Sequence, residues 1–138
     1  MRKIRIDLGI SIDFDDISIF SREDERAQGL VGRHAAIGRI NYAQVDGPDA
    51  PDGVIIYLKP ACYGTEPRDI YEYFKSNPGF PHESTADQFF TESQFESYRM
   101  LGLHTMDKMC PGKSADFPAF VRSVQAHLDG ETPASGMA

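Results

Sequence analysis

The stretch from residue 80 to residue 102, FPHESTADQFFTESQFESYRMLG, constrains the fold of this chain most, because it joins a stiff turn to a long helix without interruption. Pro81 fixes its own φ angle and favours an extended conformation at the residue before it. Thr85 and Gln88 have the spacing of a capping box, in which a Thr and a Gln side chain each bond the backbone N–H of the other residue. The sequence therefore predicts a helix from about residue 86 to residue 103, capped by Thr85.

That predicted helix carries more apolar surface than one small sheet covers. At ~100° per residue, one broad face holds Phe90, Gln94, Phe95, Tyr98 and Leu101, while Phe89 points to the other side. Two interpretations stay open: either the last helix of the chain packs on the second side, or the chain is shaped to fit a larger domain. The second interpretation predicts an isolated chain that exposes apolar surface and associates readily.

Three segments before this stretch have the patterns of strands. Residues 4–14 alternate apolar and polar side chains, which predicts a half-buried strand. Two later segments are rich in β-branched and aromatic residues, and the turn-forming residues 46–53 between them predict an antiparallel hairpin. We therefore expect a sheet with strands near residues 3–14, 36–45 and 54–60.

Two shorter helices complete the predicted architecture. Pro67 opens one near residues 67–76, and an amphipathic pattern places the other near residues 116–128. The fold class is therefore α+β, a short three-stranded antiparallel sheet with three packed helices. We expect one domain over residues 1–129, in which the loop 15–34, with its charged run 21–26, is mobile, and a disordered tail over residues 130–138.

The composition of the chain argues against several classes of binding partner. With 138 residues and a net charge of −7, the chain is one domain that is poorly suited to nucleic acid or to an anionic membrane surface. The four histidines show no paired spacing, so no metal and no other cofactor is expected. No apolar run approaches the ~20 residues of a membrane span, and no signal-peptide pattern opens the chain. We therefore expect a cytoplasmic protein.

The densest polar group consists of His82, Glu83 and Ser84, together with Asp87. Neighbouring residues in a turn rarely align as nucleophile, base and orienting acid, so we expect a structural role. In that role His82 and Glu83 tie the turn to nearby backbone, and Ser84 and Thr85 cap the helix. A contact with a ligand or another domain, and a small enzyme built on these residues, stay open as alternatives.

One flank of the helix carries charge. Glu92, Glu96 and Arg99 lie on it, and the pair three residues apart contributes only ~0.2–0.5 kcal/mol if it is exposed. Gln88, Glu92 and Arg99 could instead bond the backbone of a partner. The full set of candidate partner-contact or structural residues is Phe80, His82, Glu83, Thr85, Asp87, Gln88, Glu92, Glu96, Tyr98 and Arg99.

These residues also carry a family resemblance. The block 80–102, preceded by Tyr57-Leu58-Lys59-Pro60 and Tyr63-Gly64-Thr65-Glu66-Pro67, resembles the C-terminal region of bacterial patatin-like phospholipases, over roughly residues 2–103. The resemblance implies that the chain is the C-terminal part of a larger α/β protein that hydrolyses lipid acyl esters. It also implies a patatin-like catalytic domain as partner, in cis or in trans, with lipid as a further partner and a location peripheral to the membrane.

The catalytic residues of that family have no counterpart in this chain. The family uses a Ser in a Gly-x-Ser-x-Gly turn and an Asp followed by Gly-Gly or Gly-Ala, and neither motif occurs here. Asp46-Gly47-Pro48 and Asp52-Gly53-Val54 each lack the second small residue. We therefore expect no catalytic residue and interpret the chain as a non-catalytic segment, with the Ser and Asp upstream of residue 1. The alternative is a free-standing module that binds protein or lipid.

Overall fold

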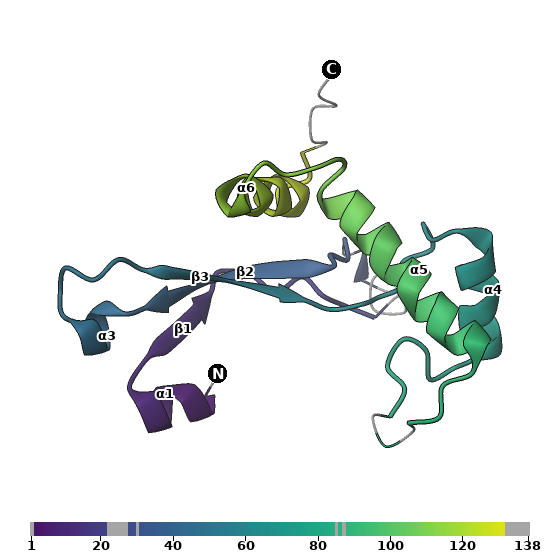
Figure 1. Cartoon of the computed structure of the whole chain (residues 1–138), viewed down its shortest axis with the longest axis horizontal. Coiled ribbons are helices and arrows are strands. Elements are labelled where there is room, and N and C mark those ends of the chain that lie inside the picture. The colour runs from purple at the N-terminus through teal and green to yellow at the C-terminus, as the bar shows by residue number, and fades with distance from the viewer. Residues whose placement is uncertain (1, 22–27, 30, 85, 87, 132–138) are drawn as a thin grey trace.

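The computed structural model describes residues 2–21, 28–29, 31–84, 86 and 88–131, with residues 2 and 3 described through their backbone alone. They form a three-stranded antiparallel sheet in the order β1–β2–β3, with helices packed on it (Figure 1). The small α+β fold expected from the sequence is therefore confirmed. Residues 22–26 of the charged run 21–26, Thr85, Asp87 and residues 132–138 of the expected tail lie outside the described residues, so the expectations for them stay predictions.

The sheet contains the predicted hairpin. Strand β2 (Ala35–Asn41) pairs antiparallel with β3 (Gly53–Leu58), with Ile37 opposite Ile56, and β1 (Ser11–Phe14) pairs with the other edge of β2. The expected strand to residue 45 was too long, because residues 43–46 form the short helix α3 (Ala43–Asp46) at the hairpin tip. There the backbone N–H groups of Val45 and Asp46 bond the carbonyl of Tyr42 instead of a strand.

The expected strand over residues 3–14 was wrong for most of its length. Residues 2–8 form helix α1 (Arg2–Leu8), and only Ser11–Phe14 is a strand. The reason lies in the register, because Ser11 pairs with Asn41, the last residue of β2. Residues before Ser11 therefore have no strand opposite them, and alternation alone cannot satisfy their backbone groups. Ile6 remains 72% exposed in the helix.

Two helices agree with the sequence prediction. Helix α4 (Arg68–Ser76) begins after Pro67, and helix α6 (Phe117–Leu128) begins after Asp116, whose carboxylate accepts a hydrogen bond from the Ala119 N–H at 2.7 Å. Both starts are determined by local residues, a proline and an N-cap aspartate, which sequence alone reveals.

The long helix does not begin where we expected. Helix α5 (Glu92–Met109) starts six residues after residue 86 and continues six residues past residue 103. Its capping box is formed by Thr91 and Gln94, whose side chains bond each other's backbone N–H groups, while Gln88 precedes the helix. The sequence contains two Thr-x-x-Gln motifs, and the second is used because Gln94 is buried and also bonds Glu83.

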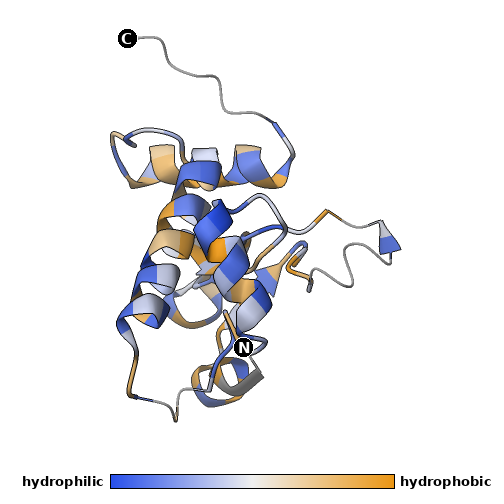
Figure 2. Ribbon diagram, turned by 90° about the vertical axis from the view of Figure 1, so that its right-hand side faces the viewer, coloured by the Kyte–Doolittle hydropathy of each residue, from blue (hydrophilic) through white to orange (hydrophobic). Residues whose placement is uncertain are grey.

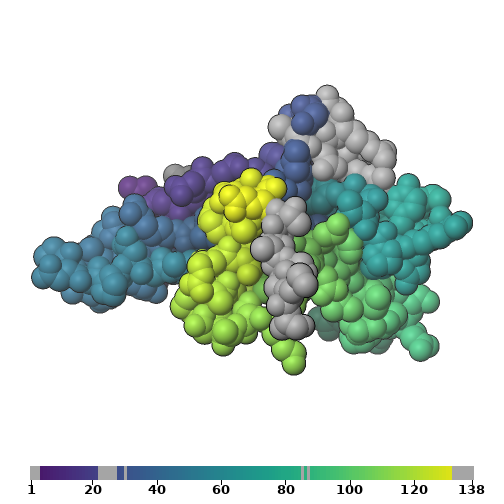
Figure 3. Space-filling model, turned by 90° about the horizontal axis from the view of Figure 1, so that it is seen from above, coloured from purple at the N-terminus to yellow at the C-terminus, as the bar shows by residue number. Residues whose placement is uncertain are grey.

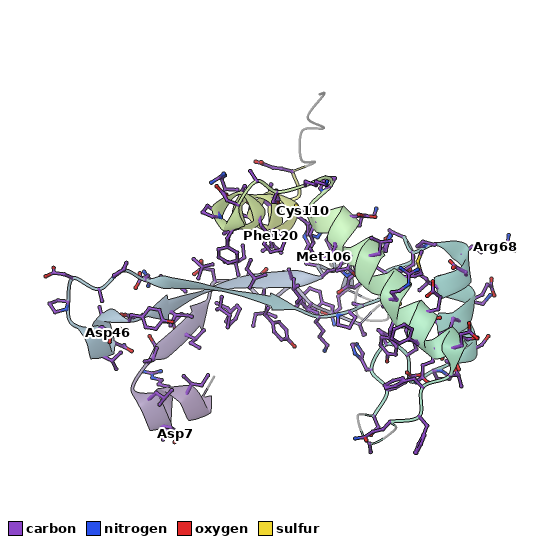
Figure 4. The ribbon with its side chains drawn as sticks, viewed as in Figure 1. Asp7, Asp46, Arg68, Met106, Cys110 and Phe120 are labelled. Atoms are coloured by element: carbon purple, nitrogen blue, oxygen red, sulfur yellow. The ribbon has the colours of Figure 1, made fainter. Side chains whose placement is uncertain are left out.

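The core has two parts. One part, between α4, α5 and the turn after α4, is built on Cys62, Ile70, Phe80 and Leu101. The other, between the sheet, the end of α5 and α6, is built on Ala35, Met109 and Val124, with Phe120 and Leu128 packed against it. Figure 4 shows Phe120 on the side of α6 that faces the sheet.

Helix α6 accounts for only part of the apolar surface of α5, which we expected to pack either on the last helix or against a larger domain. Seen from above, α6 lies over the middle of the molecule, between the projecting β2–β3 hairpin and the α4–α5 end (Figure 3). It therefore covers the sheet and the end of α5, but not the aromatic residues near the start of α5. Hydrophobic and hydrophilic residues alternate along α5 without forming one clean face (Figure 2).

Candidate binding site

The main candidate site is a hollow between the turn after Phe80 and the first turns of α5. It has a volume of about 490 Å³ and is lined by Pro81, Glu83, Ser84, Phe90, Phe95 and Tyr98. We call it the aromatic hollow. Its volume lies within the ~300–1,000 Å³ typical of small-molecule sites. Of the residues proposed from sequence, it brings together Glu83, Ser84 and Tyr98.

Phe80 anchors the turn that forms one wall of the hollow. Its ring is 2% exposed and packs edge-on against two tyrosines, with centroid distances of 5.2 Å to Tyr73 and 4.8 Å to Tyr98. Aromatic pairs in this geometry stabilise a fold by ~0.5–1.5 kcal/mol beyond the contribution of the apolar surface that they bury. Phe80 is therefore a structural residue, and it holds the turn against both α4 and α5.

Glu83 is tied to α5 by side chains, not to nearby backbone as the sequence suggested. Its carboxylate accepts a hydrogen bond from the Gln94 amide at 2.7 Å. Burial first, and then hydrogen bonding to Glu83, raise the pKa of the Tyr98 hydroxyl above its usual 10.0. The Gln94 side chain of α5 thus holds the carboxylate at the hollow. This arrangement depends on tertiary contacts that spacing could not reveal.

The neighbouring polar residues play smaller parts. The backbone N–H of His82 donates to the Gly79 carbonyl at 2.7 Å, and its exposed ring has a pKa lowered by partial desolvation and by Lys59. The Ser84 hydroxyl accepts from the Ala86 N–H at 3.2 Å. Ser84 therefore stabilises the turn and does not cap α5, because that helix begins eight residues later.

Large apolar side chains surround the hollow. Phe90 is 56% exposed and Phe95 is 62% exposed, and Phe89 nearby reaches 92%.

Farther along the helix, Arg99 donates to Glu96 at 2.6 Å, as the spacing predicted, and Glu92 lies exposed in the first turn. The ion pair is half exposed, so it contributes little to stability.

A second polar cluster, missed from sequence, lies between the sheet, α5 and α6. The ring of His34 lies 6.5 Å from that of His104 and 6.4 Å from that of His127, measured between centroids. We call these residues the histidine cluster. His34 is 4% exposed, and burial, reinforced by the two other histidines, lowers its pKa from 6.5 to about 4. Sequence analysis missed the cluster because its members lie far apart in the chain, with His34 directly before β2, His104 on α5 and His127 on α6.

The histidine cluster shows neither a metal site nor a catalytic triad. Across the described ranges, no group of three or more His, Cys, Asp or Glu residues is arranged to hold a metal ion. The Thr65 hydroxyl and the His104 Nε2 atom lie 3.1 Å apart. No carboxylate in the described part of the chain is hydrogen-bonded to His104, so the pair lacks the orienting acid of an activated nucleophile.

Comparisons with known proteins add no family to these observations. No family model, no curated protein and no solved structure matches the chain. The resemblance to patatin-like phospholipases therefore rests on the residues of the block 80–102 and the two short segments before it. Within the described residues, the helices are too short or too polar to cross a bilayer.

Proposed function

We propose that this chain is a non-catalytic C-terminal segment of a patatin-like phospholipase, with a binding surface at the aromatic hollow. The observation that carries the proposal is the position of that surface. The exposed Phe90 and Phe95 lie inside the block 80–102, the part of the chain that resembles the family most strongly. In this proposal the protein is cytoplasmic, and the complete enzyme works at the membrane periphery.

The exposure of the aromatic residues supports a docking role. Phe95 is 62% exposed although it lies in a helix whose other face packs in the core. Burying such a side chain contributes ~1.5–3 kcal/mol, so a covering partner would gain affinity from it. A catalytic domain, in cis or in trans, is the partner that the resemblance implies.

The polar groups support a non-catalytic role. His82 and Ser84 lie in the same turn, but no hydrogen bond joins the His82 ring to the Ser84 hydroxyl among the described contacts, and that hydroxyl accepts from the Ala86 N–H. A serine hydroxyl without a base is a weak nucleophile. The hydrolytic residues would therefore belong to the catalytic domain.

The DNA upstream of the first codon gives the simplest test. An in-frame extension that encodes Gly-x-Ser-x-Gly and Asp-Gly-Gly supports the proposal. An in-frame stop followed by a separate ribosome site contradicts the origin in cis.

A biochemical test uses matched variants. The chain is mixed with the patatin-like catalytic domain. The affinity of the complex and the hydrolysis of a fluorogenic acyl ester are both measured. Phe95→Ser should weaken the complex, while Phe117→Ser on α6, where the original side chain is similarly exposed at 60%, should not. Hydrolysis by this chain alone, abolished by His82→Ala, would refute the non-catalytic role.

The same surface favours one alternative function, a free-standing module that binds a protein or a lipid without enzymatic activity. The two functions differ in their partner. A module forms its complex in the absence of any acyl hydrolase, whereas the proposed segment requires the catalytic domain. Pull-down from a cell extract with the original chain and with Phe95→Ser separates the two cases.

A further inference from the structure

We propose that the aromatic hollow binds a quaternary ammonium group, namely the choline headgroup of a membrane phospholipid. The inference rests on the proposed function, because it names the class of lipid that this chain would bind and present to the catalytic domain. Three features of the described lining carry it: aromatic side chains, one carboxylate, and a scarcity of other polar groups.

The lining of the hollow is rich in aromatic rings, whose faces attract cations. Phe90, Phe95 and Tyr98 line the hollow together with the ring of Pro81. The faces of aromatic rings attract cations within ~6 Å, and quaternary ammonium groups are the ligands that such aromatic sites recognise most characteristically. Two of these rings are more than half exposed, so a ligand can reach them.

Glu83 supplies the opposite charge. The ion pairs within the described residues join Arg39 to Asp52, Lys75 to Glu72 and Arg99 to Glu96, so Glu83 has no cationic partner there. Its carboxylate faces a largely apolar hollow, where a negative charge is screened less than in bulk water. A bound cation would neutralise this charge.

The polar groups of the hollow discriminate between kinds of cation. A guanidinium has five N–H donors and an ammonium has three, and each donor needs an acceptor when it is desolvated. Among the described lining residues, the side-chain acceptors are few: the Glu83 carboxylate, one oxygen of which already accepts from Gln94, the Ser84 hydroxyl, which already accepts from the Ala86 N–H, and the Tyr98 hydroxyl. A quaternary ammonium has no donor to satisfy. Its methyl groups suit the apolar walls, and its charge suits the carboxylate.

Net charge and position favour a lipid as the source of the cation. The chain carries a net charge of −7, which repels an anionic membrane but not a zwitterionic one. Choline headgroups present their cation at the outer edge of the bilayer. Aromatic side chains such as the exposed Phe90 and Phe95 favour the membrane interface, so they can enter it beside the bound headgroup.

The first experiment uses soluble probes with the whole chain. Tetramethylammonium, choline and the neutral carbon analogue of choline are titrated, and the NMR signals of the aromatic rings are followed. We expect the two cations to bind and the neutral analogue not to bind. Glu83→Gln keeps an acceptor for Gln94 but removes the charge, and it should weaken choline binding by about fivefold or more.

The matched control separates ring faces from apolar area. Phe95→Leu keeps an apolar side chain but removes the ring face, and it should weaken choline binding by about threefold or more. Phe117→Leu, at a position of similar exposure on α6, should leave it unchanged. Circular dichroism verifies that each variant is folded. Equal binding of choline and its neutral analogue, or equal losses from both Leu variants, would overturn the proposal.

A second experiment identifies the source of the cation. Vesicles of phosphatidylcholine, phosphatidylethanolamine and phosphatidylglycerol are sedimented with the chain. We expect co-sedimentation with phosphatidylcholine that Glu83→Gln reduces. Equal binding to all three lipids would overturn the proposal. Displacement of choline from the hollow by an arginine-rich peptide at a concentration below that of choline would also overturn it. A chain that fails here but still binds the catalytic domain refutes the choline site and leaves the proposed function standing.

Discussion

Acidification should destabilise this protein through His34, whose ring lies between the sheet, α5 and α6. Around it are His104 on α5 and His127 on α6, and its electrostatic surroundings include Glu66 and Lys108. Arg33 contributes to lowering the pKa of His127, and Asp107 opposes the lowering of the pKa of His104, so both signs of charge act on the cluster. Within the described part of the chain, the His34 Nδ1 atom has no hydrogen-bond partner. The charged ring, which carries an N–H at both nitrogens, would therefore bury the Nδ1–H group without a direct acceptor.

The sign of the effect follows from the two pKa values of His34. In the unfolded chain the pKa is 6.5, and in the folded chain it is about 4. Between these values the unfolded state binds more protons, so the free energy of unfolding falls as the pH falls. The stabilisation is complete above 6.5 and is lost by about pH 4. The other two histidines have pKa values lowered by burial, so they act in the same direction.

The magnitude follows from the same values. At about 1.36 kcal/mol per pKa unit, the difference between 6.5 and about 4 amounts to about 3 kcal/mol at most for this residue, whose side chain is 4% exposed. Lowering the pH from about 7 to about 5 should therefore remove about 2 kcal/mol of the stability that His34 contributes.

Urea denaturation followed by circular dichroism at the two pH values measures this loss. His34→Gln, which keeps a polar side chain but does not titrate, should show a pH dependence smaller by about 2 kcal/mol. His82→Gln, which alters an exposed histidine outside the histidine cluster, should reduce the dependence far less than His34→Gln, because the desolvation that lowers the pKa of His82 is only partial. If His34→Gln and the original chain lose the same free energy between the two pH values, the burial argument for His34 is wrong.

Three further predictions concern stability, each measured as the change in urea midpoint. Thr91→Ala removes the capping box of α5 and should cost about 1 kcal/mol, whereas an unchanged midpoint would mean that the cap with Gln94 is not formed. Gly102→Ala, in the middle of α5 with no neighbouring atom in the way, should stabilise by about 0.5–1 kcal/mol, and destabilisation would contradict the open surroundings of that site. Gly32→Ala should instead destabilise by about 1–3 kcal/mol, because its Cβ atom would lie 2.1 Å from the Tyr63 ring, and a neutral result would show that the ring moves freely.

Part of the candidate site was visible in the sequence. The block 80–102 and its aromatic residues were singled out there, and Phe90, Phe95 and Tyr98 do line one hollow. The role of Glu83 was not visible in the sequence, because its partner Gln94 is eleven residues away and becomes a neighbour only when α5 packs on the turn. The histidine cluster was missed altogether, since its rings meet only through the packing of β2, α5 and α6.

Local chemistry determined the elements whose ends carry their own signals. Pro67 before α4, the amphipathic pattern of α6 and the turn residues between β2 and β3 act within a few residues of themselves, so the sequence alone revealed these elements. The tertiary structure decided the rest. Residues 2–8 became a helix because β2 ends at Asn41, and α5 started at Glu92 because Gln94 found a second partner in Glu83. Where two local choices have similar energies, contacts between distant residues select one of them, and such contacts exist only in the folded chain.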